Sequence, residues 1–140
     1  MIRAFTAGDH PAATALWQAT PGVGLSAADE FQAIEIFLAR NPDLSFVAQD
    51  GNELVGTILC GHDGRRGLIH HLVTALSHRR QGLGRRLLRR ALDAVQREGI
   101  TKCHLLVFRS NAEGLAFWRA IGATERKELA LFSLSTDSDG

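Results

Sequence analysis

Arginine and glycine residues with the spacing of an anion-binding turn form the run Arg79-Arg80-Gln81-Gly82-Leu83-Gly84-Arg85. The run follows a predicted strand and opens a predicted helix. Glycines let a backbone curl closely round an anion, and the free N–H groups and positive dipole end of a helix then face that anion. Arginine side chains add charge-assisted hydrogen bonds. The run therefore predicts a phosphate-binding site.

Other interpretations compete with the phosphate site. A dinucleotide-binding fingerprint needs a third glycine where Leu87 or its neighbours stand, and a P-loop needs Gly-Lys-Ser/Thr, so the sequence excludes both. A nucleic-acid-binding helix and a merely solvated basic helix face both stay open. These two readings rest on a cluster of arginines: Arg79, Arg80, Arg85, Arg86, Arg89 and Arg90.

Three features of the chain together resemble one enzyme family. Arg79-x-x-Gly82-x-Gly84 matches the Q/R-x-x-G-x-G/A motif of the GNAT superfamily of acyl-CoA N-acyltransferases. Leu72-Val73-Thr74 stands where that family has its apolar strand before the motif, and residues 111–123 resemble its N-x-x-A-x-x-F-Y-x-x-x-G-F run. The order of predicted elements also matches from one end of the chain to the other.

This resemblance implies a fold and a way of binding coenzyme A. Two parallel strands, here 68–74 and 103–108, splay apart where the first of them carries a bulge. Pantetheine pairs with the backbone near Thr74 and the pyrophosphate binds N–H groups of the glycine turn. The residues that the resemblance implies for acetyl-CoA are Leu72, Val73, Thr74, Arg79, Arg80, Gln81, Gly82, Leu83, Gly84, Arg85 and Asn111. No metal is expected.

The resemblance also implies a direct acetyl transfer in a ternary complex. Its oxyanion donor is a backbone N–H that matches Leu72. On a regular strand residues 68, 70, 72 and 74 share a face, and His71 points to the opposite one. In the family the face that holds residue 70 looks into the acyl site and some members carry a histidine at the position of His70, so the resemblance makes His70 the candidate base. His70 could equally be an ordinary packed strand residue. The glutamate that many relatives carry two positions earlier is Leu68 here.

The general acid is where the chain departs from the family. The usual tyrosine position is Trp118, and the sequence contains no tyrosine. An indole N–H is a donor with no useful acidity. The leaving thiolate therefore takes a proton from another group or from solvent, or leaves unaided, and nothing selects between Cys103 and Ser110 as substitutes. Leu76 and Gly114 replace residues that are commonly proline and alanine in relatives.

The elements that must position these residues follow from hydrophobic periodicity. Helices are predicted from Pro11 to Ala19, from a capping box at Ser26 and Asp29 to residue 40, over 83–97 and over 111–121. Strands are predicted over 2–5, 45–49, 53–60, 68–74, 103–108 and 125–134. We expect an α/β (α+β) fold with a mixed, mostly antiparallel sheet, in which the resemblance makes strands four and five parallel and splayed.

Length and composition fit one soluble domain. The 140 residues are 45% hydrophobic and 22% charged, which excludes general disorder, and we expect a single domain over 1–135 with a disordered tail over 136–140. No stretch suits a signal peptide or membrane span. The two cysteines have no metal-binding spacing, and a cytoplasmic location is expected.

The charges divide unevenly along the chain. Residues 1–64 carry two bases against eight acids, net −6, and residues 65–140 carry fourteen bases against seven acids, net +7. The resemblance implies an acetyl-CoA-dependent N-acetyltransferase that receives its acceptor near the loop 20–25, with Trp17 nearby, and the acidic N-terminal half fits a cationic amine acceptor. The alternatives are a catalytically weak acyl-CoA-binding module and a basic nucleic-acid binder. A metabolite, a peptide N-terminus and a lysine stay open as acceptors, as does a homodimer.

Overall fold

The computed structural model describes residues 1–137 in two compact units, Met1–Phe108 and the part of Arg109–Gly140 that lies within the described range. Each unit is described by itself below. Residues 138–140 of the predicted tail lie outside the described residues. None of the described helices is long and apolar enough to cross a membrane.

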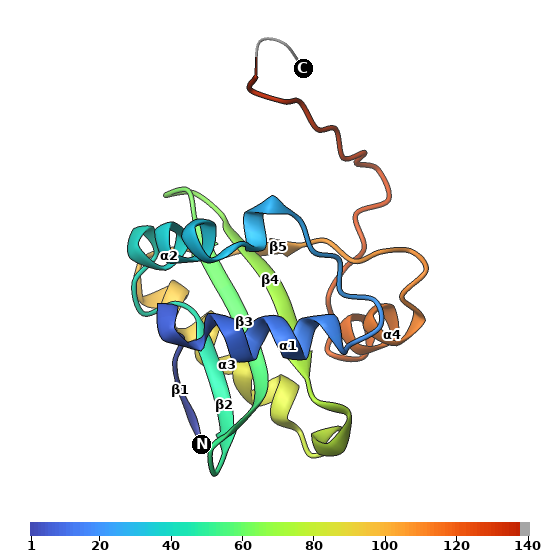
Figure 1. Ribbon diagram of the computed structural model, residues 1–140. Helices are drawn as coiled ribbons and strands as arrows, with labels where there is room; N and C mark the ends of the chain where they lie inside the picture. Colours follow the sequence, from blue (N-terminus) through green and yellow to red (C-terminus); the bar gives the residue numbers. More distant parts are fainter. Residues whose placement is uncertain (138–140) are drawn as a thin grey trace. The chain divides into compact units, whose positions relative to one another are not determined.

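The first unit is built on a five-stranded sheet in the spatial order β1-β2-β3-β4-β5 (Figure 1). Neighbouring strands are antiparallel except β4 and β5, which are parallel. The mixed, mostly antiparallel α/β architecture predicted from the sequence is thereby confirmed. The strands are β1 (Ile2–Ala4), β2 (Phe46–Asp50), β3 (Glu53–His62), β4 (Gly67–Thr74) and β5 (Cys103–Leu105).

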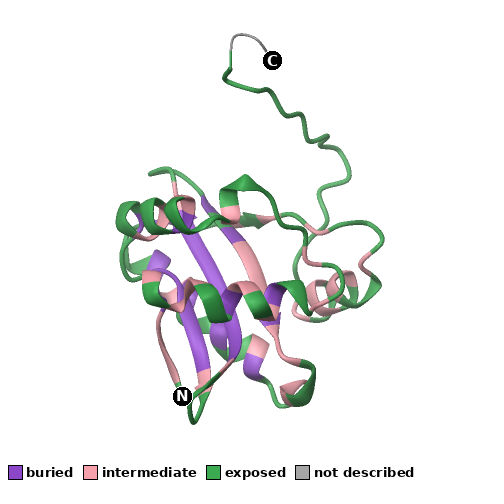
Figure 2. Cartoon of the chain, in the orientation of Figure 1, coloured by how far each residue is buried: buried purple, intermediate pink, exposed green. Residues whose placement is uncertain are grey.

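Helices cover both faces of the sheet. Helices α1 (His10–Gln18) and α2 (Phe31–Arg40) cover one face, where Trp17 and Ile34 share a buried cluster with Leu59 and Val73. Helix α3 (Leu83–Arg97) covers the other face, and its Leu87 lies against Gly56 of β3. Of the strands between these layers, β2 and β3 are the most deeply buried (Figure 2). The apolar stripe predicted for residues 83–97 is the buried face of α3.

Strands β4 and β5 pair over only a short stretch. Their ladder joins Gly67–Ile69 to Cys103–Leu105 and ends there, although β4 continues to Thr74. The predicted strand over 103–108 is therefore shorter in the structure, where Leu106 and Phe108 are exposed. Beyond Ile69 the β5 side of β4 has no paired strand within the first unit, which is the splay that the resemblance implied.

The second unit contains α4 (Ala112–Ala120). The Asn111 side chain caps this helix by accepting a hydrogen bond from the Gly114 N–H at 3.0 Å. A Cβ at Gly114 would lie 2.6 Å from Nδ2 of Asn111, which accounts for glycine at this position.

The strand predicted over 125–134 is wrong. No strand is assigned between residue 125 and residue 137. Strand backbone needs a neighbouring strand for its N–H and C=O groups, and the described part of the second unit contains only a helix. The segment also lacks alternation, because Leu129-Ala130-Leu131-Phe132 is continuously apolar.

Candidate active site

The arginine–glycine run forms the turn that enters α3. Gly82 is the N-cap residue of α3 with a left-handed φ of 75°, and Arg80 has a φ of 64°. The Gly82 carbonyl accepts the first helical hydrogen bond from the Arg86 N–H at 3.1 Å. The chain thus curls at the positive end of a fifteen-residue helix, where backbone N–H groups and arginines can receive phosphate.

Side-chain contacts tie this turn to the end of β4 and to β2. Nε of Arg79 donates to the Thr74 carbonyl at 3.3 Å. His78, in the short 3₁₀ helix η3 (Leu76–His78), pairs with Asp50 at 2.9 Å. The anion-binding turn and the open edge of β4 are therefore held next to each other, as binding one extended ligand requires.

A β-bulge interrupts β4 beside this open edge. Thr57 pairs with Val73 and Leu59 pairs with His70, so the single residue between them on β3 opposes both His71 and Leu72. His71 has a left-handed φ of 47°. The bulge lies just past the last residue of β4 that pairs with β5, so the Leu72 backbone lies at the splay.

The bulge turns both histidines to the same face of the sheet. Opposed residues of an antiparallel pair share a face, which places His70 with Val73. The His71 ring lies 4.6 Å from Trp17 of α1, and the His70 ring lies 6.1 Å from Phe37 of α2. The prediction that His71 points to the opposite face is wrong, because one extra residue shifts the alternation.

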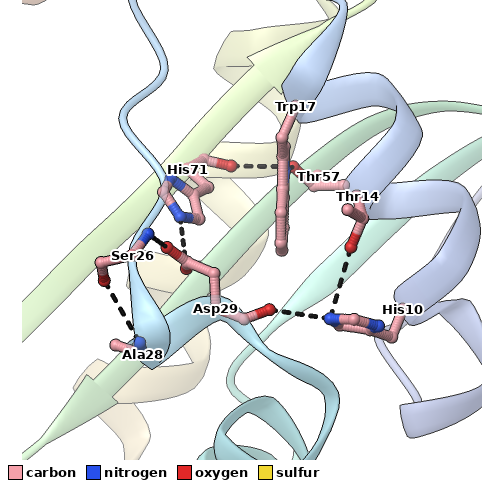
Figure 3. Close-up of polar contacts among 8 residues, drawn as sticks. All are labelled: His10, Thr14, Trp17, Ser26, Ala28, Asp29, Thr57 and His71. Atoms are coloured by element: carbon pink, nitrogen blue, oxygen red, sulfur yellow. Dashed lines mark hydrogen bonds and ion pairs between the residues drawn. The ribbon is translucent and has the colours of Figure 1, made fainter.

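His71 is held at both its ring and its backbone (Figure 3). Its Nε2 lies 2.7 Å from Oδ1 of Asp29. The Thr57 hydroxyl donates to the His71 carbonyl at 2.8 Å and accepts from the indole N–H of Trp17 at 2.9 Å. A buried hydrogen-bonded chain thus fixes the backbone conformation of the bulge.

Asp29 is itself fixed by the start of a short helix. It ends η2 (Ala27–Asp29), where its Oδ2 accepts from the Ser26 N–H at 2.9 Å and Oγ of Ser26 accepts from the Ala28 N–H at 3.2 Å. The predicted capping box is therefore confirmed, although it opens a 3₁₀ turn and α2 begins only at Phe31. The Asp29 carbonyl also contacts Nε2 of His10 at 2.7 Å.

His70 lies in a different environment from its neighbour. It lines a hollow of ≈ 100 Å³ with Ala28, Asp29, Ile34, Phe37 and Leu59. Burial lowers the pKa of His70 below its ordinary value, the charge of a protonated His71 lowers it further, and Asp29 opposes both effects. Burial is therefore the main reason that the neutral form of His70 is favoured.

A larger pocket opens between α1 and the segment before α2. Its volume is ≈ 220 Å³, and Asp29 lines both this pocket and the hollow beside His70. Trp17, which is 1% exposed, belongs to the core and also forms one wall. The other lining residues are His10, Thr14, Gln18, Leu25, Ser26 and Glu30.

The two candidate substitutes for the general acid, Cys103 and Ser110, belong to different units. Cys103 lies on β5 with its sulfur over Gly67, and hydrogen bonding by Cys60 lowers the pKa of the Cys103 thiol and raises that of Cys60. Trp118 and Ser110 belong to the second unit. Among residues 1–137 no cluster of three or more potential metal ligands occurs.

Reasoning from the sequence missed the pairing of His71 with Asp29. Asp29 is explained as a helix cap, and strict alternation turns His71 away from the site. The useful signal is the strand bulge that the resemblance itself implies, because any bulge before Thr74 breaks the alternation on which the assignment of His71 depends.

Comparisons with known proteins agree with this geometry. A family model described as "Acetyltransferase (GNAT) family" matches residues 11–123. The chain is 32% identical over 110 residues to "Acetyltransferase ECA0875" of Pectobacterium atrosepticum, covering 79% of this chain and 77% of that protein. It is 27% identical over 104 residues to N-alpha-acetyltransferase 30 of Schizosaccharomyces pombe, covering 71% and 69%.

Solved structures share the fold. The PaiA N-acetyltransferase from Thermoplasma acidophilum in complex with coenzyme A superposes with a TM-score of 0.73 at 19% identity, covering 87% of each chain. An aminoglycoside 6'-N-acetyltransferase from Acinetobacter haemolyticus gives a TM-score of 0.76 at 18% identity, covering 98% of this chain and 99% of that chain.

Proposed function

Because the chain belongs to the acetyltransferase (GNAT) family, we propose that it moves the acetyl group of acetyl-CoA to a primary amine by direct attack in a ternary complex. The observation that carries the proposal is the bulged, splayed β4 beside the glycine turn of α3. The open edge of β4 offers backbone groups for pantetheine, and the glycine turn offers an anion site for the phosphates. A single extended thioester can therefore span both.

The residues of the turn fit the phosphates of coenzyme A. Left-handed backbone at Arg80 and Gly82 curls the chain round the N-terminus of α3, and the arginines supply positive charge. In this proposal the pyrophosphate is held by the whole turn, which consists of Arg79, Arg80, Gln81, Gly82, Leu83, Gly84 and Arg85. Leu72, Val73 and Thr74 pair with the pantetheine.

The acetyl thioester supplies an activated acyl carbon. The Leu72 N–H, at the bulge, is the proposed donor to the carbonyl oxygen as that oxygen gains charge. His70, on the face of β4 that meets Phe37 of α2, is a candidate base, and burial lowers its pKa, which favours the neutral ring. No side chain in the first unit is assigned as the acid, and the thiolate takes its proton without one.

The acceptor enters, in this proposal, through the pocket of ≈ 220 Å³ between α1 and residues 25–30. Asp29 and Glu30 line it, and the N-terminal half of the chain is acidic, so a cationic primary amine fits better than an anionic one. One relative is named N-alpha-acetyltransferase 30, a name that indicates an N-terminal amine as its acceptor. A peptide N-terminus and a small diamine are the two acceptor types to test first.

A catalytically weak acyl-CoA-binding module is the second candidate function. The observation that favours it is Trp118 at the position of the family's tyrosine. The intact histidines and the carboxylate beside the bulge favour the enzyme. Nucleic-acid binding is a weaker candidate function than either of these. In this proposal the reaction takes place in the cytoplasm, where acetyl-CoA is available.

The test is an acceptor screen with acetyl-CoA. Free thiol released from acetyl-CoA is measured with peptides of different N-termini and with small diamines, and products are identified by mass spectrometry as a mass increase of one acetyl group. Amine-dependent thiol release supports the enzyme. Coenzyme A binding without thiol release for any amine would establish the binding module instead.

A further inference from the structure

We propose that His71, oriented by Asp29, is the base that takes the proton of the acceptor amine. The inference rests on the proposed function, because it assigns a residue to that same reaction. It replaces His70 as the candidate base and makes Asp29 a positioning residue.

The position of His71 depends on a local backbone departure that several contacts maintain. A left-handed φ at a residue with a side chain is uncommon and persists where surrounding contacts hold it. Here the Thr57 hydroxyl holds the carbonyl at 2.8 Å, and Trp17 packs on the ring with centroids 4.6 Å apart. The histidine and the Leu72 N–H belong to one fixed bulge, so the base and the oxyanion donor are adjacent in the chain.

The contact with Asp29 selects the tautomer. The carboxylate accepts a hydrogen bond from Nε2–H, with an Nε2–Oδ1 distance of 2.7 Å, so the lone pair of the neutral ring lies on Nδ1. Nδ1 is bonded to Cγ and therefore stays close to the bulge backbone. Nδ1 makes no hydrogen bond. Every fully buried side-chain N or O atom within residues 1–137 does make one. Nδ1 is therefore not fully enclosed by protein, and in this proposal the amine approaches it.

The two histidines differ in what their surroundings do to a positive charge. His71 has the Asp29 carboxylate in contact, and each of these side chains is 15% exposed. His70 has no carboxylate in contact and faces apolar residues of α2. The titratable groups around His71 are Asp29 on η2, His70 on its own strand, 6.5 Å away between rings, and His10 on α1, which binds the Asp29 carbonyl. Asp29 is the one that compensates an imidazolium.

The step balances without a protein acid. Nδ1 of His71 takes one proton from the ammonium group of the acceptor. The neutral amine then bonds to the acetyl carbon, the C–S bond breaks with its electron pair on sulfur, and the second amine proton passes to the sulfur to give the thiol. His71 returns its proton to solvent. The reaction written in this way needs no tyrosine at position 118, where this chain has tryptophan.

The kinetic test compares His71→Gln, Asp29→Asn and His70→Gln. Loss of a general base lowers kcat by roughly 10²–10⁴-fold, so this is expected for His71→Gln with the affinity for coenzyme A unchanged. Asp29→Asn should lower kcat less, because His71 keeps its ring and loses only the carboxylate that orients it. His70→Gln losing as much as or more than His71→Gln would overturn the assignment.

The control is His62→Gln. His62 contacts Glu98 at the same 2.7 Å distance, yet it lies at the end of β3 outside the site. It should keep wild-type kcat. Thermal denaturation of each variant shows whether it is folded, and the isosteric Asp29→Asn change keeps the test valid if His71→Gln is unstable. An inactive wild type overturns the proposed function, whereas an active His71→Gln overturns only this inference.

A readout independent of activity is the tautomer of His71. Long-range ¹H–¹⁵N NMR of the protein without substrate should show protonation at Nε2 in the wild type and a mixture of tautomers in Asp29→Asn. Protonation at Nδ1 in the wild type would overturn the proposal, because that nitrogen would then have no lone pair to offer.

Discussion

Neighbouring residues give two adjacent histidines different chemical characters. His70 lies against Phe37 in a hollow whose lining is mostly apolar but includes Asp29, whereas His71 is in direct contact with the Asp29 carboxylate. Burial penalises the charged form of an imidazole, and a carboxylate contact favours it. The consequence for His70 is a pKa below its ordinary value, and that shift links its titration to the stability of the fold.

His70→Gln should reduce the pH dependence of stability. With a lowered pKa in the folded state, His70 binds its proton more readily when unfolded, so stability is full above the ordinary histidine pKa of about 6.5 and falls as pH decreases from there toward the lower folded value. Wild-type Tm should therefore fall more between pH 7 and pH 5 than the Tm of the variant. Equal falls, measured by circular dichroism, would contradict the environment described for His70.

At the scale of elements, the bulge in β4 depends on a hydroxyl of the neighbouring strand. Thr57 is fully buried and joins the Trp17 N–H to the His71 carbonyl. A buried donor or acceptor that loses its partner costs about 1–3 kcal/mol. The bulge is therefore an arrangement of three elements, β3, β4 and α1, rather than a local property of β4.

Thr57→Val should destabilise the fold by about 1–3 kcal/mol, because it leaves both the Trp17 N–H and the His71 carbonyl without a partner. It should also lower turnover, since the His71 ring follows its backbone. The free energy of unfolding in urea is the measurement, and Thr57→Ser, which keeps the hydroxyl, is the control. A stable, fully active Thr57→Val protein would mean that the bulge does not depend on the Thr57 hydroxyl.

The same scale explains what the sequence could predict. Turn residues and periodicity predict the order and bounds of α3 and the capping box at Ser26 and Asp29, because both are local patterns. The bulge at His71 is set by Thr57 and Trp17, which are far away in the sequence, so alternation alone misplaces it. The segment 125–134 is apolar enough to suggest a strand, yet pairing depends on a partner that no local pattern specifies.

Gly82→Ala should weaken binding of coenzyme A. Gly82 has a φ of 75°, and a side chain in left-handed backbone costs about 1–2 kcal/mol, so the turn relaxes and its N–H groups move. Isothermal titration with coenzyme A measures the loss. Gly51→Ala is the matched control, because Gly51 has a φ of 62° in the β2–β3 turn and a Cβ there would also meet nothing within 4 Å. Equal affinity in both variants would contradict the phosphate site.

At the scale of the whole chain, charge divides between the two proposed ligands. The acidic residues 1–64 supply Asp29 and Glu30 to the acceptor pocket, and the basic residues 65–140 supply the arginines of the turn. An anionic cofactor and a cationic acceptor are each attracted to the part of the chain that carries the opposite charge. This attraction acts beyond direct contact and is weakened by salt, with a screening length of about 10 Å at 0.1 M.

Salt should therefore raise the KM for an acceptor with two positive charges more than for an analogue with one. A diamine carries a second positive charge toward Asp29 and Glu30, whereas a monoamine of equal length with a terminal hydroxyl carries none. Raising NaCl from 20 to 200 mM should increase the KM of the diamine several-fold more than that of the amino alcohol, because only the diamine loses a second screened attraction. Glu30→Gln should reduce this difference while leaving the affinity for coenzyme A unchanged, since Glu30 lies in the pocket lining and not in the turn. If both acceptors respond equally to salt in the wild type, the acidic half does not select for charge, and the acceptor is chosen by shape alone.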